Sequence, residues 1–243
     1  MFSVVGDNVI ITGGARGIGL ELAKGFSDSG ANVVILDISS PERKGKYKYL
    51  HCDLGSQNHI KNAINKLRLD GFIPKTLINC AAVTLPSPSC EYSDTDWNRS
   101  ISINLSGVFS MCREIGKIMI DSNIPGSIIN FTSIGAEQGF ANNPGYAATK
   151  GAVKQLTKAL AVEWGVFGIR VNNIVPGYTN TPMNSKSWND PVLRRQRSDH
   201  TVFGRWAEPI EMVGPTIFLA SDASSYITGT DLVVDGGWLV KGM

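Results

Sequence analysis

Hydrophobic residues fall in short, nearly continuous runs along the chain, and these runs predict seven β-strands. Several consist almost entirely of Val, Ile and Leu, which is typical of strands covered on both faces. The predicted strands are Val9–Thr12, Val33–Leu36, Tyr47–Cys52, Thr76–Cys80, Ser127–Phe131, Arg170–Val175 and Leu232–Val234.

Longer segments with a helical pattern separate these runs, near residues 17–29, 56–69, 95–121, 146–166 and 208–220. Strands and helices that alternate in this way predict an α/β fold with a parallel sheet and right-handed crossovers. No internal repeat, low-complexity tract or linker interrupts the pattern, so residues 1–243 are predicted to form a single domain. Residues 177–206 form one long irregular stretch, which we expect to be a substrate lid or a disordered segment.

Charge and composition narrow the classes of function. The 23 Lys and Arg residues against 21 Asp and Glu give a net charge of +2, which offers no electrostatic basis for binding nucleic acid or an anionic membrane. No apolar stretch is long enough to span a membrane, and no leader pattern opens the chain. We therefore expect a cytoplasmic protein.

The cysteines and histidines give no sign of a metal site. The four cysteines lack a C-x-x-C spacing, and the three histidines are scattered. Three of the cysteines lie in apolar runs, which is typical of reduced, buried thiols. We expect no metal.

A glycine-rich turn, TGGARGIG at 12–19, follows the first predicted strand. The spacing of Gly13, Gly17 and Gly19 departs from G-x-G-x-x-G, the pattern of many dinucleotide-binding turns, but such a turn can bind a dinucleotide in the same way. Glycines let backbone amides approach a pyrophosphate at the N-terminus of the next helix, where the helix dipole favours anions. The alternative is an ordinary tight turn, but its place after the first strand of an α/β pattern favours a dinucleotide site.

The second strand leads into Asp37, eighteen residues beyond Gly19. A carboxylate at this place can accept hydrogen bonds from the adenosine ribose and would repel a 2′-phosphate, which favours NAD over NADP. Arg16 in the glycine turn argues the other way, because a guanidinium can hold a phosphate. We expect NAD, with NADP as the less favoured cofactor.

Tyr146 and Lys150 lie four residues apart in a segment that begins like a helix, PGYAATKGA at 144–152. Residues at this spacing share a helix face. Alone, the two side chains are either a solvated surface pair or a pair arranged for proton transfer.

Further motifs decide between these alternatives. They are Asp53-Leu54, NCAA at 79–82, Asn104, Ser133 thirteen residues before Tyr146, and PGYTNTPM at 176–183. With the glycine turn and the Tyr-x-x-x-Lys pair, in this order and at these spacings, the chain resembles the short-chain dehydrogenase/reductase family over nearly its full length. In one departure, Ala82 stands where the family usually has glycine, and its methyl group could crowd the cofactor.

The resemblance implies a doubly wound Rossmann sheet of seven parallel strands, with helices on both faces and a bound nicotinamide cofactor. Asp53 would contact the adenine, Asn79 would act through its backbone, and Thr181 would meet the nicotinamide carboxamide. By match to the family's motifs, the cofactor-binding residues would be Gly13, Arg16, Gly17, Ile18, Gly19, Asp37, Asp53, Leu54, Asn79, Ala81, Tyr146, Lys150, Pro176, Gly177, Thr179 and Thr181.

The resemblance also implies four catalytic residues. A free tyrosine has a pKa of about 10, and the Lys150 ammonium and the positive nicotinamide ring are expected to lower the pKa of Tyr146. Tyr146 would then exchange a proton with the substrate oxygen while hydride moves to or from the nicotinamide. Ser133 would orient that oxygen, and Asn104 would support a relay of water and backbone towards Lys150.

Polar residues around the expected cleft suggest a hydroxylated substrate. Gln138, Asn142 and Asn143 follow Ser133, in the segment that lines one side of the family's substrate cleft. Arg194 and Arg197 lie in the expected lid and can pair with a carboxylate or phosphate. The alternative for these arginines is a solvated helix face.

The C-terminal third resembles one branch of the family. GRW at 204–206, FLASDASSYITG at 218–229 and DGGWL at 235–239 are similar to gluconate 5-dehydrogenase and deoxygluconate dehydrogenases. We therefore expect NAD(P)-dependent interconversion of a secondary alcohol and a ketone on a sugar, sugar acid or polyol. A 3-oxoacyl-carrier-protein reductase activity is the alternative, because much of this tail is shared with those enzymes.

A second alternative is a non-catalytic NAD-binding protein, which would be expected to lack Ser133, Tyr146 or Lys150; all three are present. The resemblance also implies a homo-oligomer, a tetramer or a dimer, that packs through the helices near 95–121 and 146–166.

Overall fold

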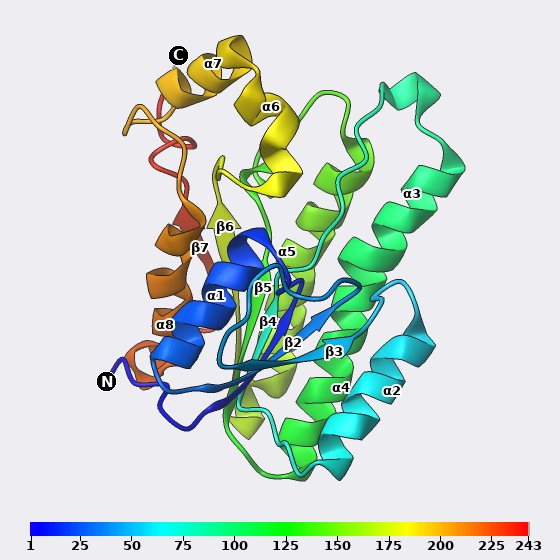
Figure 1. The fold of residues 1–243 in the computed structure, drawn as a ribbon, viewed down its shortest axis with the longest axis vertical. Helices are drawn as coiled ribbons and strands as arrows, with labels where there is room; N and C mark the ends of the chain where they lie inside the picture. Colours follow the sequence, from blue (N-terminus) through cyan, green and yellow to red (C-terminus); the bar gives the residue numbers. More distant parts are fainter. Residues whose placement is uncertain (243) are drawn as a thin grey trace.

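The computed structural model describes residues 1–242, and its centre is a parallel sheet of seven strands (Figure 1). All seven strands predicted from the hydrophobic runs are present. They are β1 Asn8–Thr12, β2 Asn32–Asp37, β3 Tyr47–His51, β4 Thr76–Asn79, β5 Gly126–Phe131, β6 Ile169–Pro176 and β7 Asp231–Val234.

The strand order is β3-β2-β1-β4-β5-β6-β7, so the direction of winding reverses between β1 and β4. β1 pairs with both neighbours, and Ile10 stands opposite Val34 on one side and Leu77 on the other. In sheets of this kind ligands bind where the winding reverses, outside the carboxyl ends of the strands. The sheet therefore directs attention to the loops that follow β1 and β4.

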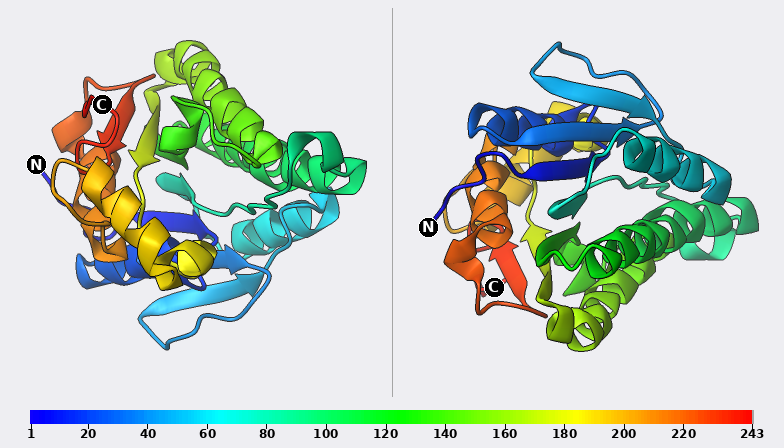
Figure 2. Two further views of the ribbon diagram at one scale, coloured as in Figure 1. Left: turned by 90° about the horizontal axis from the view of Figure 1, so that it is seen from above. Right: turned by 90° about the horizontal axis from the view of Figure 1, so that it is seen from below.

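Helices cover both faces of the sheet, as Figure 2 shows from above and below. Side chains alternate along β1, so that Val9 and Ile11 belong to one hydrophobic core and Ile10 to the other. One face is covered by α1 Gly17–Asp28 and α8 Val213–Ala220, and the other by α2 Gln57–Leu69, α4 Val108–Asp121 and α5 Pro144–Trp164. The predicted doubly wound fold is confirmed.

The helix expected over 95–121 contains an irregularity that the sequence pattern did not reveal. α3 Asp94–Ile101 is capped at its N-terminus by Ser93, whose side chain accepts a hydrogen bond from the Asp96 N–H. The segment Ser102–Gly107 then widens into a π-helix before α4 continues. Such π-segments often occur at functional sites, and this one contains Asn104.

The stretch expected to be irregular, 177–206, is largely helical, so that part of the prediction was wrong. It contains a 3-10 turn Pro182–Asn184, α6 Ser185–Asn189 and α7 Pro191–His200. α7 begins there because the Asp190 side chain accepts hydrogen bonds from two backbone N–H groups of its first turn, and Pro191 suits the first helical position.

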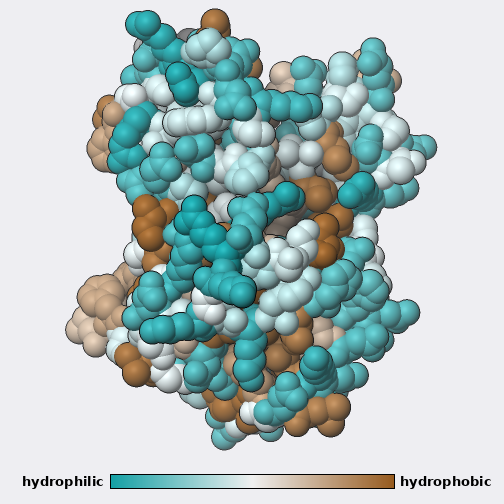
Figure 3. Space-filling model, viewed as in Figure 1, coloured by the Kyte–Doolittle hydropathy of each residue, from teal (hydrophilic) through white to brown (hydrophobic). Residues whose placement is uncertain are grey.

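α6 and α7 lie above the carboxyl ends of the strands, at the top of Figure 1. The molecular surface narrows beneath them, and apolar residues are visible in this narrowing (Figure 3). We call residues 177–206 the lid.

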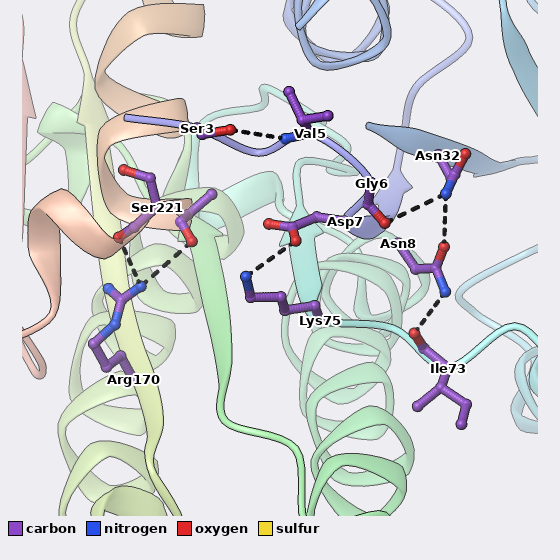
Figure 4. A network of polar contacts seen from close by, with 11 residues as sticks. Ser3, Val5, Gly6, Asp7, Asn8, Asn32, Ile73, Lys75, Arg170 and Ser221 are labelled. Carbon is purple, nitrogen blue, oxygen red and sulfur yellow. Dashed lines mark hydrogen bonds and ion pairs between the residues drawn. The ribbon is translucent and has the colours of Figure 1, made fainter. Parts of the chain in front are cut away.

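The opposite end of the sheet is closed by polar contacts (Figure 4). Lys75 Nζ lies 3.0 Å from Asp7 Oδ1, and the Asn8 amide donates to the Ile73 carbonyl at 2.9 Å. Arg170 donates to the Leu219 carbonyl at 2.8 Å and to Ser224 at 2.7 Å, which joins β6 to the end of α8. Among residues 1–242, no helix has the length and apolar character needed to cross a bilayer.

Candidate active site

The glycine turn after β1 packs directly against the loop after β4. Gly13 has φ +71°, and a Cβ atom there would lie 2.6 Å from Ala81 Cα; a Cβ atom on Gly19 would lie 2.1 Å from the Gly13 carbonyl oxygen. A side chain at position 13 would force the two loops apart, and one at position 19 would collide with the backbone of the glycine turn itself. The turn therefore presents bare backbone at the place where the winding of the sheet reverses, as a dinucleotide pyrophosphate requires.

The N-terminus of α1 fits an anion. Arg16 occupies the N-cap position, and no side chain caps the helix there, whereas Ser56 and Ser93 cap α2 and α3. The first N–H groups of a helix have no partner within the helix, and they carry the positive end of its dipole. A phosphate placed there would satisfy these groups. The residues present therefore fit the phosphates of a dinucleotide.

Asp37 ends β2 beside this turn. One carboxylate oxygen accepts the Ala15 N–H at 3.0 Å, and the other accepts the Ser39 N–H at 3.0 Å. These bonds hold the carboxylate at the edge of the glycine turn, where the ribose next to the pyrophosphate would lie. The Arg16 side chain is exposed.

The other predicted cofactor residues surround the same crevice in different ways. Asp53 follows β3 and accepts the Gly55 N–H at 2.8 Å. The Asn79 side chain points into the interior and donates to Asn130 Oδ1 at 2.8 Å, so a cofactor could meet Asn79 only through its backbone. A Cβ atom on Gly17 would lie 3.6 Å from the Thr181 side chain, which places the start of the lid against the glycine turn.

Ser133, Tyr146 and Lys150 come together at the carboxyl ends of β4 and β5. Ser133 follows β5, and its hydroxyl accepts the Gly135 N–H at 3.0 Å. Lys150 Nζ lies 5.5 Å from the centre of the Tyr146 ring and donates to the Phe131 carbonyl at 2.6 Å. Lys150 is only 4% exposed, so the solvated surface pair is excluded.

The pKa of Tyr146 depends on its burial in the site. Burial raises it, and the Ser133 side chain offsets only part of the rise. The lowering of this pKa by Lys150 together with a bound nicotinamide ring stays a prediction; in the structure the ammonium lies over the face of the Tyr146 ring and donates a hydrogen bond to a backbone carbonyl. Among the chain's own groups, desolvation dominates, and the phenol is protonated at neutral pH.

Burial also lowers the pKa of Lys150, to about 8, and Cys80 opposes part of this shift. An ammonium out of contact with water is costly, because only the Phe131 carbonyl solvates it here. A lysine with a pKa near the working pH can gain or lose a proton readily, which is typical of functional sites.

Asn104 acts as a clamp between segments. Its amide oxygen accepts the Val83 N–H at 2.8 Å, and its amide nitrogen donates to the Val83 carbonyl at 2.9 Å and to the Thr149 hydroxyl at 3.3 Å. The side chain is fully buried. The π-segment thus ties the loop after β4 to the helix that carries Tyr146 and Lys150; the predicted relay to Lys150 stays a prediction.

The predicted substrate residues lie in two places. Gln138 is half-buried and Asn142 is exposed, both in the loop after Ser133. The Asn143 amide is already held by Thr84 Oγ1 at 2.8 Å. In the lid, Arg194 is exposed and stacks on Trp188, with its guanidinium carbon 5.3 Å from the ring centre, whereas Arg197 is half-buried.

Three residues of the site were not predicted from the sequence. Cys80 follows β4, and its thiol lies close enough to Lys150 and Tyr146 to influence the pKa of both. Tyr178 influences the pKa of Tyr146 from the start of the lid, and its ring lies 4.9 Å from that of Trp238. Both aromatic residues lie in the motifs PGYTNTPM and DGGWL, whose aromatic positions after two strand ends were the available signal.

Comparison with known proteins places these features in a family. Residues 13–239 match the family model described as enoyl-(acyl carrier protein) reductase. The chain is 37% identical over 251 aligned positions to 2-dehydro-3-deoxy-D-gluconate 5-dehydrogenase of Pseudoalteromonas atlantica, and the alignment covers 98% of each chain.

Solved structures agree. The crystal structure of a gluconate 5-dehydrogenase from Burkholderia cenocepacia in complex with NADP and tartrate superposes with a TM-score of 0.93 at 33% identity, and covers 98% of this chain and 97% of that one. A 4-hydroxyisoleucine dehydrogenase complexed with NADH has a TM-score of 0.93 at 30% identity, over 97% of this chain and 100% of that one.

Proposed function

Because this chain belongs to the short-chain dehydrogenase/reductase family, we propose that it is an NAD(P)-dependent oxidoreductase that interconverts a secondary alcohol and a ketone on a sugar acid or a related polyol. The observation that carries the proposal is the buried Lys150 beneath Tyr146, with Ser133 beside them, next to a glycine turn that fits a dinucleotide.

The chain's own groups handle the proton of this reaction. In the reductive direction, the protonated Tyr146 hydroxyl donates to the carbonyl oxygen; in the oxidative direction, the phenolate accepts the proton of the alcohol. Ser133 holds the same oxygen. The bound nicotinamide supplies or accepts the hydride. The Lys150 ammonium, which lies over the face of the Tyr146 ring, stabilises the phenolate. Asn104 holds the π-segment against α5, the helix that carries Tyr146 and Lys150.

We propose NAD as the preferred cofactor. Asp37 presents a carboxylate, fixed by two backbone N–H groups, beside the glycine turn. A charge there favours two free ribose hydroxyls and disfavours a 2′-phosphate. The relatives include proteins whose structures hold NADP and one that holds NADH, so the family accommodates both.

The substrate class follows from the relatives and the cleft. The P. atlantica and B. cenocepacia proteins are named for gluconate-type substrates, and the latter was crystallised with the hydroxy acid tartrate. The lid arginines suit an acid. The alternative substrate is an acyl group on a carrier protein, and it is supported by the match to the enoyl-(acyl carrier protein) reductase family model.

Three further properties belong to the proposal. Residues 177–206 act as the lid of a single cofactor-binding domain over residues 1–243. The protein works in the cytoplasm and binds neither membrane nor nucleic acid. It forms a homo-oligomer, a dimer or tetramer, through α4 and α5, on which Phe109 and Val162 are 39% and 83% exposed.

The test is the formation of reduced nicotinamide by the purified protein, with NAD and NADP in parallel. The panel holds D-gluconate and related sugar acids, D-glucitol and other polyols, simple secondary alcohols and a 3-hydroxyacyl thioester. Tyr146→Phe is the matched control, because it removes one oxygen and keeps the ring against Lys150. We expect turnover of a sugar acid with NAD, abolished by Tyr146→Phe, with NADH binding retained.

If the thioester alone is turned over, the protein is a 3-oxoacyl-carrier-protein reductase and the sugar-acid assignment is wrong. A Tyr146→Phe variant as active as the wild type would refute the proposed proton donor. If the wild type binds NADH but is silent with every substrate, the proposed oxidoreductase function on sugar acids and polyols is wrong.

A further inference from the structure

Two arginines of the chain are not exposed, and they differ in how their guanidinium groups are satisfied. Arg170 donates to the Leu219, Ser221 and Ala220 carbonyls and to Ser224. Arg197 has a buried Nη1 atom with no hydrogen-bond partner, and no ion pair of residues 1–242 includes it. A half-buried cation without an acceptor costs free energy unless a ligand supplies one.

Aromatic rings fix the position of Arg197. Its guanidinium carbon lies 4.5 Å from the ring centre of Tyr178 and 5.9 Å from that of Trp206. The Arg197 side chain also lies within hydrogen-bonding reach of the Tyr178 hydroxyl, where its charge lowers the pKa of that phenol against the effect of burial. The side chain is thus placed by α7 and by the rings beneath it, while its Nη1 group stays without a partner.

A second unused donor lies on the same aromatic cluster. The indole N–H of Trp238 is buried and has no partner. The centre of the Trp238 ring lies 4.9 Å from the centre of the Tyr178 ring and 4.2 Å from that of the His200 ring. The carboxylates on the same segments have other partners, since Asp199 pairs with Arg195 and Asp235 accepts backbone N–H groups.

We propose that Arg197 and the Trp238 N–H form the binding site for the carboxylate of the substrate, with Tyr178 as the platform between this site and Tyr146. This inference rests on the proposed oxidoreductase function. Both groups are donors only, so they require an acceptor, and a carboxylate offers two oxygens in a plane, which matches the guanidinium fork.

The neighbouring arginines do not serve this role. The side chain of Arg195 is 85% exposed and pairs with Asp199 on the outer face of α7. Arg194 is exposed and stacks on Trp188. All three arginines lie on α7, but of the three only Arg197 reaches the ring of Tyr178. Tyr178 in turn lies close enough to Tyr146 to affect the pKa of Tyr146.

The site sets the orientation of the substrate. When the carboxylate is held at the lid, its position determines which hydroxyl-bearing carbon of the substrate reaches Tyr146 and Ser133. That carbon is the one that reacts. The Nη1 atom is closed off from water in this structure, so α7 must shift slightly when the acid enters. Lids in enzymes commonly move in this way. A neutral polyol would leave both donors unpaired and would bind less tightly.

The experiment compares kcat and KM for D-gluconate with those for D-glucitol, which lacks the carboxylate, in the wild type and three variants. Arg197→Gln keeps much of the stem, Trp238→Phe keeps the ring but removes the N–H, and Arg195→Gln is the matched control. For the acid we expect kcat/KM to fall about 10- to 100-fold in Arg197→Gln and about 3- to 10-fold in Trp238→Phe, through KM. For the polyol, and for Arg195→Gln, we expect no change.

Equal losses on acid and polyol, or no loss on the acid, would overturn the carboxylate site while the oxidoreductase function stands. A wild type that turns over D-glucitol at least as efficiently as D-gluconate would also overturn it. Calorimetric titration of D-gluconate into the NADH-bound protein tests the site independently of turnover. If the wild type has no activity, loss of this binding in Arg197→Gln still supports the site, and unchanged or absent binding rejects it.

Discussion

The body of the molecule and its lid use polar groups in opposite ways. In the body, Arg170 is joined to three backbone carbonyls and a serine at the base of the sheet. In the lid, Arg197 is held mainly by aromatic side chains and keeps a buried Nη1 group without a partner. The two side chains are similarly half-buried, so the difference lies in what surrounds them.

A chain of amides runs through the body beneath the site. The Asn79 amide donates to Asn130, Asn130 donates to the Thr157 hydroxyl at 2.8 Å, and Thr157 donates to Asn173 at 2.6 Å. Asn173 then donates to Asp231 at 2.7 Å. These bonds tie β4, β5, α5, β6 and β7 together directly below Tyr146 and Lys150, so the catalytic groups stand on a base with little freedom to move.

The lid is built instead from stacked aromatic rings, with Tyr178 at the centre and Trp206 5.0 Å from it. Such contacts depend less on direction than hydrogen bonds do, so they can adjust when a ligand enters. In the proposed function, the rigid body therefore fixes the geometry of proton transfer, and the lid recognises the substrate.

Lys150→Met should lower kcat about 10²- to 10⁴-fold, because Tyr146 loses the charge that stabilises its phenolate. The same variant tests the cost of this buried charge in the body. Burial lowers the pKa of Lys150 from 10.5 to about 8, so the unfolded chain holds this proton more tightly than the folded one. Stability from this group therefore increases as the pH rises from about 8 to 10.5, and below pH 8 its desolvation cost is fully present.

Urea unfolding of wild type and Lys150→Met at pH 7.5 and pH 10 measures this contribution, since the other titrating groups cancel between the two proteins. We expect the wild type to gain stability relative to the variant at the higher pH, by an amount on the order of 1–3 kcal/mol. A difference between the two proteins that is the same at both pH values would mean that Lys150 is not desolvated in solution.

Arg170→Gln and Arg197→Gln contrast the two regions directly. Arg170→Gln leaves several carbonyls without their donor and should lower the free energy of unfolding by about 2–3 kcal/mol. Arg197→Gln removes the stacking on Tyr178 and a polar contact with its hydroxyl, and should cost about 1 kcal/mol or less. Thermal unfolding of the two variants distinguishes them, with roughly 2–4 °C of Tm for each kcal/mol. Equal losses would show that the lid is as tightly built as the body.

Asp37→Asn tests whether the body also sets the choice of cofactor. The amide keeps an acceptor for a backbone N–H but removes the charge that disfavours a 2′-phosphate. We expect the ratio of kcat/KM for NAD to that for NADP to fall about 10-fold. Glu42→Gln, an exposed acid near the same turn, serves as control and should leave the ratio unchanged. An unchanged ratio in Asp37→Asn would assign the preference to other residues.

The body was more predictable from sequence than the lid, and the reason is physical. Its strands are continuous apolar runs such as Val33–Leu36, so the pattern predicted β2, and the spacing of Tyr146 and Lys150 placed both on one helix. The position of Asp37 at the end of the second strand predicted a carboxylate for the adenosine ribose, and in the structure this carboxylate lies beside the glycine turn.

What the sequence could not supply depends on contacts between distant segments. Tyr178, Arg197 and Trp238 come from three places in the chain, and only the folded lid brings them together. The π-segment at Asn104 has no signature in a helical pattern. The raised pKa of Tyr146 was also unpredicted, since it depends on burial that the spacing of two residues does not reveal.

The smallest expected effect concerns the thiols, and it tests whether the body is as closed as its hydrogen bonds imply. Burial raises the pKa of Cys80 and of Cys112 to about 12 and that of Cys52 to about 11, whereas Cys90 is exposed. Because the thiolate is the reactive form, an aromatic disulfide reagent at pH 8 should modify Cys90 rapidly without loss of activity. The buried Cys52 and Cys112 should react only on unfolding, and the half-buried Cys80 should react slowly because of its raised pKa. Rapid modification of Cys80, with loss of turnover, would mean that the crevice beside Lys150 opens as freely as the lid. The contrast between a rigid body and an adjustable lid would then not hold at the proposed catalytic centre.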